Sequence, residues 1–382
     1  MKVVYIAPMF HTNQVPIVKG WVEHWHQVAF VCQYQGRTEN HKYCTPYVLG
    51  YSALFNAVNA LRSFWYKKSA VACAYPEAFR DKCGFPPLIR LFRYLKKQAP
   101  DIVILRERSL YSIFAYFICR LLKFPCILYN QTPLWDNEPP RNDFAHKLVK
   151  KLTPAVRMTP VFGNPATGYL DNSAVYIPFV TEPQLAPEQK SYFKNQQINL
   201  LCVGKFEERK HHLMLLEVLC EFLPQYPLHL TLVGQVSTEY HKNYYKKVQD
   251  FIKSQHLEAF VTCHTNCKPE SMADFYRTAD LFILPSTGEF ASISQLEAMS
   301  YSLPVIVSDT NGTACYVENG ENGYLFKDKD RADLKAKITS VIVDRDNLMR
   351  MGSSSYHLVC EKYSFANYQK KIEQLAATAA EL

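Results

Sequence analysis

At 382 residues the chain is about twice the usual length of a domain, so two domains are expected. Apolar residues make up 48% of the chain and charged residues 20%, which excludes a disordered or fibrous protein. The net charge of +8 is unevenly distributed: residues 1–190 contain 23 Lys and Arg against 12 Asp and Glu, and residues 191–382 contain 20 against 23. The two halves are therefore expected to be separate units with different partners.

Neither a membrane span nor an export signal is expected. The longest apolar run, residues 110–119, stops at Arg120 and falls short of the roughly 20 residues that cross a bilayer. Residues 1–8 contain one Lys and then Pro8, which predicts a first strand and is too short for the apolar core of a signal peptide. The expected location is the cytoplasm, either free or at the inner face of the membrane.

The cysteines do not form a recognisable metal or redox motif. All 12 are scattered, and no two have the C-x2-C spacing of a zinc or redox site. Cys263, His264 and Cys267 lie close together, but no second pair is near them, so no metal site is expected. Most of the thiols are expected to be small core residues in a reducing compartment.

The first half alternates short β-rich runs with amphipathic segments. Turn residues bound the runs, which predicts strands at 2–8, 27–33, 101–107, 125–131 and 174–180. Helices are predicted between them at 86–98 and 109–123. Alternating strands and helices predict a parallel sheet that is covered on both faces.

The second half repeats this pattern. Strands are predicted at 198–204, 228–234, 259–264, 281–286 and 303–309. Helices are predicted at 212–223, 244–255, 271–279, 292–301, 331–342 and 364–380. This is a second doubly wound sheet, and the polar, Pro-containing stretch 181–197 is expected to join the two.

Two such sheets place their ligand sites opposite each other. Open parallel sheets bind ligands beyond the carboxyl ends of their strands, so two facing domains are expected to form one deep cleft between them. The predicted fold class is α/β, with two Rossmann-like domains facing across that cleft. The expected division is a first domain at 1–185, a second at 196–355, and a C-terminal segment at 356–382.

Three segments of the second half follow predicted strands and could meet a ligand. The first, VGKFEERK at 203–210, places Lys205, Arg209 and Lys210 near a strand end, which suits phosphate but is also typical of a solvated charge cluster. The third, at 308–326, contains glycines that permit close backbone approach or simply form turns.

The second segment, PSTGEFASISQLEAM at 285–299, contains two acids. Glu289 lies in the loop after a strand, and Glu297 lies on the following helix. Between them, 291–294 supply small residues and a helix start with free backbone N–H groups. Carboxylates accept hydrogen bonds from pairs of sugar hydroxyls, although two acids eight residues apart are common by chance.

The order of these segments resembles a known family. VGKFEERK, LTLVG, ADLFILPSTGEFASISQLEAMSYSLPVIVSD and ENGYLF together resemble the donor half of the GT-B glycosyltransferases, most closely glycosyltransferase family 4 (glycosyl transferases group 1). The resemblance covers residues 200–326, whereas the first half matches only in its strand order. It implies a donor domain in the second half, an acceptor domain in the first, and a last helix that crosses back to the first domain.

The resemblance implies roles for individual residues. Lys205 and Lys210, which follow Gly204, would grip a nucleotide diphosphate. Glu289 would face the donor sugar and Glu297 would hold the ribose. The backbone amides of three further residues would meet the distal phosphate: Ala291, Ser292 and Ile293.

The chain departs from the family pattern at several positions. The family usually has Arg where Lys205 stands, and the substitution keeps the charge but loses the bidentate fork. It often has Phe-Gly where Ala291 and Ser292 stand. A glycine-rich loop is replaced by PMFHTNQ at 8–14, and a frequent histidine is Gln131. The donor half is therefore expected to be intact and the acceptor half divergent.

The implied reaction is sugar transfer with retention of configuration by an enzyme of the hexosyltransferase type. Lys205, Lys210 and the helix start at 291–293 would stabilise the charge on the leaving diphosphate, so neither a metal nor a cofactor is expected. The donor substrate would be a nucleotide-diphosphate sugar. His11, after the first strand, is a candidate base, although a loop histidine is more often simply exposed.

The basic first half suggests an anionic acceptor or an anionic membrane surface. Residues 79–97 interleave Phe, Leu and Ile with Arg and Lys, as in an interfacial helix or in a helix packed on its own sheet. No nucleic-acid recognition motif is present, so nucleic acid is not an expected partner.

Three functions remain open from the sequence. The first is a glycosyltransferase that builds a bacterial surface polysaccharide, lipopolysaccharide or glycolipid. The second is a catalytically silent protein of the same fold that acts as a binding partner. The third is another enzyme of this architecture, such as a phosphorylase or an epimerase. Retention of both Glu289 and Glu297 argues against the silent alternative.

Overall fold

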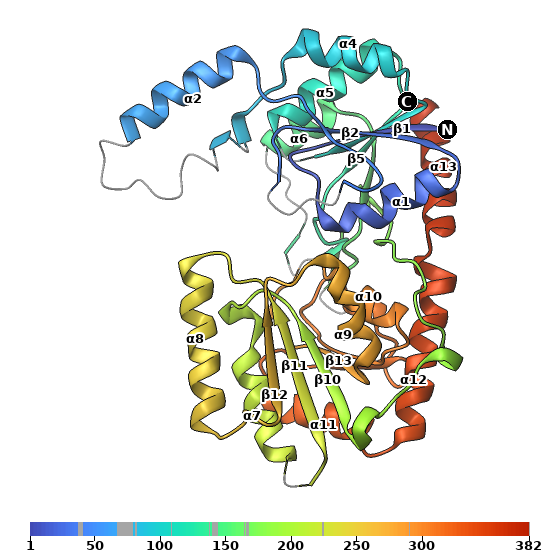
Figure 1. Cartoon of the computed structure of the whole chain (residues 1–382). Coiled ribbons are helices and arrows are strands. Elements are labelled where there is room, and N and C mark those ends of the chain that lie inside the picture. The colour runs from blue at the N-terminus through green and yellow to red at the C-terminus, as the bar shows by residue number, and fades with distance from the viewer. Residues whose placement is uncertain are drawn as a thin grey trace.

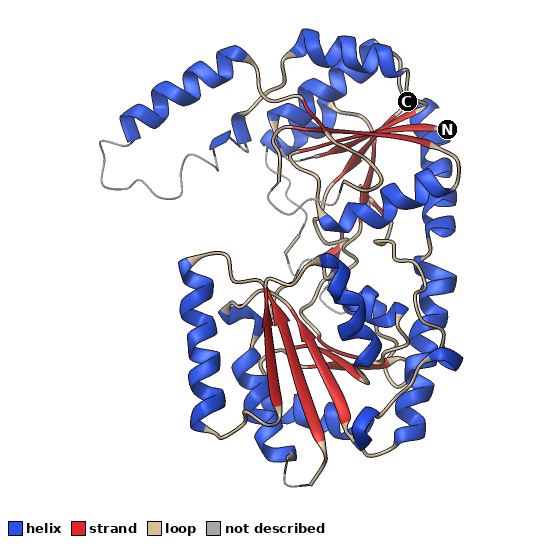
Figure 2. Cartoon of the chain, in the orientation of Figure 1, coloured by secondary structure: helices blue, strands red, loops and turns tan. Residues whose placement is uncertain are grey.

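Two parallel β-sheets, one in each half of the chain, dominate the structure (Figure 2). The computed structural model describes residues 1–36, 41–66, 79, 80, 82–107, 109–136, 138, 139, 144–163, 165, 168–223, 225–289 and 291–381. The predicted fold class is confirmed.

The first sheet has seven strands in the order β3-β2-β1-β4-β5-β7-β9. Its strands are β1 (Lys2–Ala7), β2 (Gln27–Cys32), β3 (Tyr47–Val48), β4 (Ile102–Arg106), β5 (Cys126–Tyr129), β7 (Val156–Thr159) and β9 (Val175–Tyr176). β1 pairs in parallel with both β2 and β4, so that Val3 lies between Val28 and Ile102. This arrangement puts the reversal of strand order between β1 and β4, which is where such sheets bind ligands.

Helices cover both faces of the first sheet. Helix α1 (Val15–Glu23) and α13 (Phe365–Glu381) pack on one face through a core that includes Trp21, Phe30 and Ile372. Helix α4 (Leu88–Gln98) and α5 (Leu110–Leu121) pack on the other through a core that includes Leu91 and Val103. Central strands that are buried on both faces explain the nearly continuous apolar runs in the sequence.

The second sheet has six parallel strands in the order β12-β11-β10-β13-β14-β15. Its strands are β10 (Ile198–Val203), β11 (Leu228–Gly234), β12 (Val261–Thr265), β13 (Leu281–Leu284), β14 (Val305–Ser308) and β15 (Gly323–Phe326). The order again reverses beside its first strand, between β10 and β13. The loops that follow these two strands are therefore neighbours, although they lie far apart in the sequence.

The helices of the second half follow the predicted pattern. They are α7 (His212–Phe222), α8 (Glu239–Ser254), α9 (Met272–Thr278), α10 (Ile293–Ser300), α11 (Arg331–Ile342) and α12 (Arg345–Leu358). Thr238, Asp330 and Asp344 cap α8, α11 and α12 by accepting backbone N–H groups.

The end of the chain returns to the first half. Helices α12 and α13 follow one another along one side of the molecule (Figure 1), and α13 contributes Phe365, Tyr368 and Ile372 to the core of the first sheet. The expected boundary between 355 and 356 falls within α12, and α13 itself begins at Phe365.

Several elements are absent from the sequence predictions. These are α1, α2 (Ala53–Tyr66), α6 (Phe144–Leu152), α12, the strands β3, β7 and β15, and a small antiparallel pair formed by β6 (Trp135–Asp136) and β8 (Tyr169–Leu170). β15 lies inside the segment 308–326, which the sequence predicted to be a loop. Its first residue, Gly323, approaches Val305 so closely that a Cβ would overlap the Val305 backbone, so this glycine is part of a strand pair as well as a turn.

Among the described residues no helix is long and apolar enough to cross a membrane.

Candidate functional site

The loop after β10 carries the predicted cations. Gly204 donates its backbone N–H to the carbonyl of Val233 at 2.9 Å, which holds the loop beside β11. A 3-10 turn at Glu208–Lys210 then folds Lys210 inward, where it is buried. Lys205 is exposed and makes no hydrogen bond or ion pair with another residue of the described part of the chain. The two predicted lysines therefore differ in environment.

Glu289, in the loop after β13, joins two of these cations. Its Oε2 accepts from Nη1 of Arg209 at 2.8 Å and from Nζ of Lys210 in a very close contact. Burial alone would raise the pKa of Glu289, but the charges and hydrogen bonds of Lys210 and Arg209 outweigh it and hold the pKa below its ordinary value. Glu289 is therefore an ionised carboxylate at the reversal of strand order.

Arg209 bridges two acids. Its Nη2 lies 2.7 Å from Oε1 of Glu207, while its Nη1 binds Glu289. These neighbouring carboxylates raise the pKa of Arg209, although partial burial opposes the shift. The sequence placed Arg209 in the cation cluster but gave it no role, because spacing does not show which way a side chain in a turn points.

Backbone hydrogen bonds hold three loops together around this cluster. Gly312, in the loop after β14, donates its N–H to the carbonyl of Glu289 at 2.6 Å, and Thr287 donates to the carbonyl of Arg209 at 2.8 Å. The Thr287 hydroxyl lies 2.6 Å from Nε2 of His211 and donates to Asp328 at 2.7 Å. The loops after β10, β13 and β14 thus form one site.

Glu297 occupies a different position, one helix turn inside α10. Its Oε2 accepts from the hydroxyl of Tyr276 on α9 at 2.7 Å. Burial raises the pKa of Glu297, and the hydrogen bond from Tyr276 partly opposes that shift. Within the described residues, no contact joins Glu297 directly to Lys210 or Glu289.

The start of α10 presents backbone N–H groups beside Glu289. Ser292 is the N-cap in an extended conformation, and its side chain does not cap the helix. Instead the Ser292 and Ser294 hydroxyls lie 2.9 Å apart. The first turn, which includes Ile293 and follows Ala291, is therefore not capped by its own N-cap side chain, and such N–H groups attract anions.

A buried polar cluster connects α10 to the loop after β14. The Thr313 hydroxyl lies 2.7 Å from Oε1 of Gln295 and 2.8 Å from Oδ1 of Asn311, and all three side chains are buried. No sequence pattern indicates this cluster, because its members come from α10 and from the loop after β14.

On the first half, a pocket opens at the carboxyl ends of the strands. Its lining includes Gln14 after β1, Arg106 at the end of β4, Tyr129 at the end of β5, Pro160 after β7 and Phe179 in the stretch that leads to the second half. His11 is exposed, and its backbone N–H donates to Oε1 of Gln14 at 2.9 Å. The candidate base is therefore adjacent in sequence and space to a pocket residue but does not line the pocket.

Gln131, which replaces the frequent family histidine, belongs to a chain of hydrogen bonds beside this pocket. It accepts from Nη2 of Arg106 at 2.9 Å and donates to the Tyr129 hydroxyl at 2.9 Å. The Arg106 guanidinium also lies over the Tyr129 ring, 4.7 Å from its centroid. Gln131 thus orients two pocket residues.

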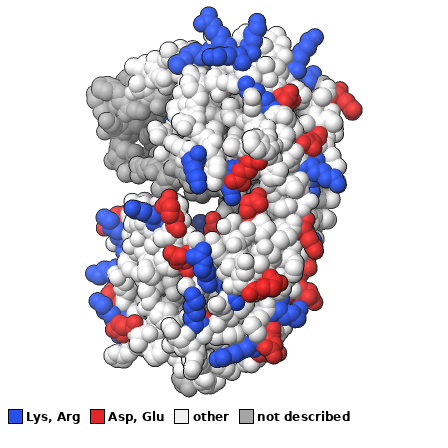
Figure 3. All heavy atoms as spheres, turned by 45° about the vertical axis from the view of Figure 1, so that its right-hand side comes forward, with Lys and Arg blue, Asp and Glu red and all other residues white. Residues whose placement is uncertain are grey.

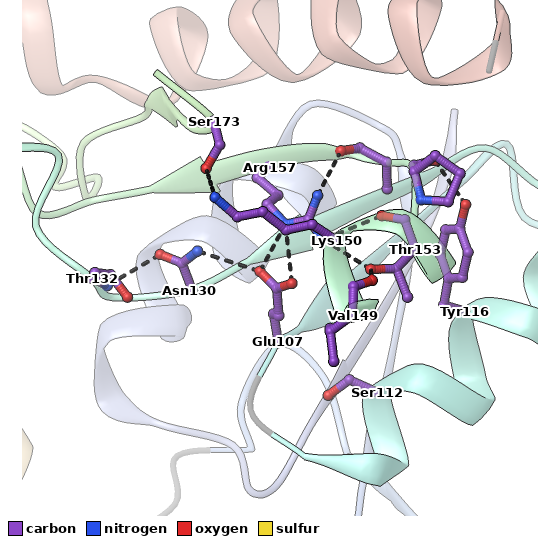
Figure 4. A network of polar contacts seen from close by, with 12 residues as sticks. Glu107, Ser112, Tyr116, Asn130, Thr132, Val149, Lys150, Thr153, Arg157 and Ser173 are labelled. Atoms are coloured by element: carbon purple, nitrogen blue, oxygen red, sulfur yellow. Dashed lines mark hydrogen bonds and ion pairs between the residues drawn. The ribbon is translucent and has the colours of Figure 1, made fainter. Parts of the chain in front are cut away.

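A buried ion pair fixes the neighbouring strand ends (Figure 4). Nε of Arg157 in β7 lies 3.0 Å from Oε1 of Glu107, which follows β4. Arg157 also donates to Thr153 at 2.8 Å, and Asn130 makes a long contact of 3.4 Å with Glu107. These contacts connect residues of, or directly after, β4, β5 and β7.

The described residues include no cluster of three His, Cys, Asp or Glu side chains that could hold a metal ion. The surface between the two halves is hollowed, and Figure 3 shows charged side chains of both signs around the hollow.

Comparisons with known proteins agree with this arrangement. Residues 186–358 match the family model for glycosyl transferases group 1. A D-inositol 3-phosphate glycosyltransferase from Nocardia farcinica is 34% identical over 84 residues, which are 22% of this chain and 19% of that protein. Mannosylfructose-phosphate synthase from Agrobacterium fabrum is 27% identical over 170 residues, 44% of this chain and 37% of that protein. The chain thus spans well under half of the length of these relatives.

The fold is similar over its whole length to solved structures. HepE from Anabaena, solved in complex with UDP and glucose, aligns with a TM-score of 0.68 and 13% sequence identity, covering 99% of this chain and 100% of that chain. At this identity the similarity concerns the fold. The predicted resemblance of the second half to the glycosyl transferases group 1 is confirmed.

Proposed function

We propose that this chain, whose residues 186–358 belong to the glycosyl transferases group 1, transfers a sugar from a nucleotide-diphosphate sugar to an acceptor hydroxyl. The observation that carries the proposal is the meeting of Lys210, Arg209 and Glu289 at the reversal of strand order, beside the start of α10. Two cations, one ionised acid and free helix N–H groups at one point are the groups that a sugar diphosphate requires. Residues 196–355 would bind the donor and residues 1–185 the acceptor.

The donor diphosphate would replace Glu289 as the partner of the cations. Lys210 and Arg209 would turn to the phosphates, with Lys205 and the amides of Ala291, Ser292 and Ile293 completing the anion site. Glu289 would then accept hydroxyl groups of the sugar, and Glu297 would accept those of the ribose. Because HepE was solved with UDP and glucose, uridine diphosphate sugars are the first donors to test.

The reaction would proceed without a metal and with retention of configuration. As the bond between the anomeric carbon and the diphosphate breaks, negative charge grows on the leaving group, and Lys210 and Arg209 would stabilise it. The acceptor hydroxyl would arrive on the face of the leaving group, from the pocket near Gln14 and Arg106. His11 is the candidate group to receive its proton.

The acceptor would be a glycan or a lipid-linked sugar in the synthesis of a bacterial surface polysaccharide, lipopolysaccharide or glycolipid. The basic character of residues 1–190 supports an anionic acceptor or an anionic surface. The place of action would be the cytoplasm, at the inner face of the membrane. Closure of the two halves on the substrates would exclude water that could hydrolyse the donor.

The test is release of free nucleotide from UDP, GDP and ADP sugars, with and without a chelator and with an acceptor panel. We expect one donor to release its nucleotide, with the same rate in the chelator. Binding of a donor without release under any condition would favour the silent alternative. A chelator-sensitive rate would overturn metal independence alone.

The ribose role of Glu297 is tested by calorimetry with the nucleotide diphosphate. Glu297→Ala should weaken binding at least about tenfold, because it removes a charged hydrogen-bond acceptor. Tyr276→Phe is the matched control, since it removes the partner hydroxyl and keeps the carboxylate. Unchanged affinity in Glu297→Ala would refute this role.

A further inference from the structure

The helices of the first half expose rows of apolar side chains. On α5, four apolar residues follow one another at helical spacing on the outer face, and Leu121 is 73% exposed. The row consists of Leu110, Phe114, Phe117 and Leu121. Residues separated by three or four positions lie on one side of a helix, so the row is continuous along α5.

Two further helices carry similar rows. On α6 the row is Phe144, which is 80% exposed, followed by Leu148 and Leu152. On α2 it is Leu54, which is 68% exposed, followed by Val58 and Leu61. We call these ten side chains of α2, α5 and α6 the apolar surface. Soluble proteins scatter exposed apolar residues singly, and rows of this kind mark interaction sites.

Side-chain contacts connect the three helices. The rings of Phe114 in α5 and Phe85 are 5.7 Å apart, and those of Phe85 and Phe55 in α2 are 6.1 Å apart. On the other side of α5, the Tyr116 hydroxyl donates to the carbonyl of Pro154, just after α6, at 2.7 Å. All three helices lie in the first half of the chain, where α2 extends outward from the sheet (Figure 1).

The charged side chains of the four helices in this region have one sign, and Asp171, 3.9 Å from Lys150 of α6, is an acid beside them. Helices α2, α4, α5 and α6 together contain nine Lys and Arg residues and no Asp or Glu. Lys147 and Lys151 on α6 and Arg120 on α5 are exposed between or beside the apolar rows. Figure 3 shows further Lys and Arg gathered at the end of the molecule that is farthest from the second half.

This combination favours a lipid surface over a protein partner. Protein interfaces are depleted in Lys, whereas interfacial helices combine Phe and Leu on one face with Lys and Arg beside them. Cations near an anionic membrane are each attracted to it, and nine cations without a carboxylate leave no repulsive group on these helices.

Helix α4 overlaps residues 79–97, the segment that the sequence indicated for contact with a membrane. Leu91 and Leu95 of α4 are completely buried against the first sheet, whereas Leu88 and Ile89 at the start of the helix are 42% and 68% exposed. Its Arg90, Arg93 and Lys96 remain exposed. Helix α4 therefore supplies mainly charge, with two exposed apolar side chains at its start, and the apolar rows belong to the other three helices.

We propose that the apolar surface of α2, α5 and α6, with the cations beside it, docks this protein on the surface of an anionic lipid bilayer. The side chains of Leu121 and Phe144 enter the boundary between headgroups and acyl chains, while Lys147 and Lys151 meet lipid phosphates. This docking is independent of the donor site, and it would bring the pocket of the first half close to lipid-linked acceptors.

The test is sedimentation of the full chain with vesicles of phosphatidylglycerol and phosphatidylcholine in equal parts, compared with vesicles of phosphatidylcholine alone. We expect binding to the anionic vesicles to be at least about tenfold tighter and to weaken with salt. The double variant Leu121→Ser with Phe144→Ser should lose binding at least about tenfold, and so should Lys147→Glu with Lys151→Glu.

The matched control is Tyr240→Ser with Val343→Ser, which removes two similarly exposed apolar side chains from the second half. This control should bind like the wild type, and thermal melting should show that all variants are folded. Three outcomes would overturn the proposal: no binding of the wild type to anionic vesicles, equal loss in the control, or self-association without lipid that the double serine variant abolishes. None of these outcomes bears on nucleotide release, so this experiment and the nucleotide-release assay test membrane docking and the proposed reaction separately.

Discussion

Glu289, in the loop after β13, pairs with Arg209 and Lys210 in the loop after β10. Each of these two cations is also a candidate ligand of phosphate. Lys210 is buried while Arg209 is partly exposed, so Lys210 is the more restrained of the two. A fixed, partly dehydrated ammonium stabilises growing negative charge more than a solvated one, because less reorganisation accompanies the reaction.

Lys210→Ala should therefore lower kcat by roughly 100-fold or more while shifting the thermal midpoint much less, since Arg209 still pairs with Glu289. Nucleotide release and thermal melting measure the two effects. Lys247→Ala is the control, because Lys247 pairs with Glu208 of the same turn at 3.1 Å but is exposed. A loss of stability in proportion to the loss of rate would instead show that Lys210 is a structural residue.

His212 lies two residues after Lys210, and its buried environment shifts its pKa. It is completely buried, it stacks on Phe206 with ring centroids 4.9 Å apart, and neither ring nitrogen has a hydrogen-bond partner among the described residues. Burial lowers the pKa of His212 to about 3, and the charge of Lys210 acts in the same direction.

Because the folded pKa lies below that of the unfolded chain, the unfolded state binds the extra proton as the pH falls below about 6.5. Stability is therefore lost in acid, by about 2 kcal/mol between pH 6.5 and pH 5 from this group alone. His212→Phe should reduce that loss, as measured by urea unfolding at both pH values. His357→Gln, at an exposed histidine of α12, is the control, and an identical pH dependence in His212→Phe and the wild type would contradict this account.

At the scale of elements, Lys190 binds the stretch between the two sheets to the C-terminal end of α9. Nζ of Lys190 donates to the carbonyls of Tyr276 at 2.9 Å and Arg277 at 3.0 Å, which are free at the C-terminus of that helix. Burial lowers the pKa of Lys190 to about 7, although the charge of Asp280 opposes the shift. The same helix holds Glu297 through Tyr276, so the contact of Lys190 also supports the candidate site.

The unfolded chain keeps the proton of Lys190 up to about pH 10.5, whereas the folded chain releases it near pH 7. Stability should therefore rise with pH across this window. Relative to Lys190→Met, the wild type should gain about 2 kcal/mol of unfolding free energy between pH 7 and pH 9. Lys246→Met, at an exposed lysine of α8, should not alter the slope, and a Lys190→Met slope equal to that of the wild type would refute the assignment.

At the scale of the whole molecule, α13 ties the end of the chain to its beginning. Gly20 in α1 lies against Phe365, and a Cβ at this glycine would overlap the Phe365 ring. The two helices therefore approach more closely than any other residue would allow. Tyr176 of β9 and Cys315 of the second half form a further link, with 3.3 Å between the hydroxyl and the sulfur.

Gly20→Ala should displace Phe365 and lower the unfolding free energy by about 1 to 3 kcal/mol, even though Ala is the better helix former. Calorimetry should show a lower midpoint, and limited proteolysis should show earlier cleavage near α13. Glu23→Ala is the control on the same helix, where Glu23 makes only a 3.7 Å pair with Lys19. An unchanged midpoint in Gly20→Ala would show that α13 does not depend on this contact.

The candidate site was partly predictable. Lys205, Lys210 and Glu289 follow strands whose apolar runs are clear in the sequence, and the ends of parallel strands meet at one edge. The roles of Arg209 and Tyr276 were not predictable, because they depend on contacts between residues 80 and 21 positions apart. Strand β15 was missed because four residues that begin with Gly carry little periodicity.

The sequence by itself determined the alternation of strands and helices, and with it the α/β class and the side of each sheet on which ligands bind. Periodicity suffices for this because it reflects which positions of an element face a core. Only the tertiary structure decided which apolar faces are covered, since Leu95 of α4 is completely buried while Leu121 of α5 is 73% exposed. Both residues lie in amphipathic helices of the same half, and burial depends on neighbours that are distant in the sequence.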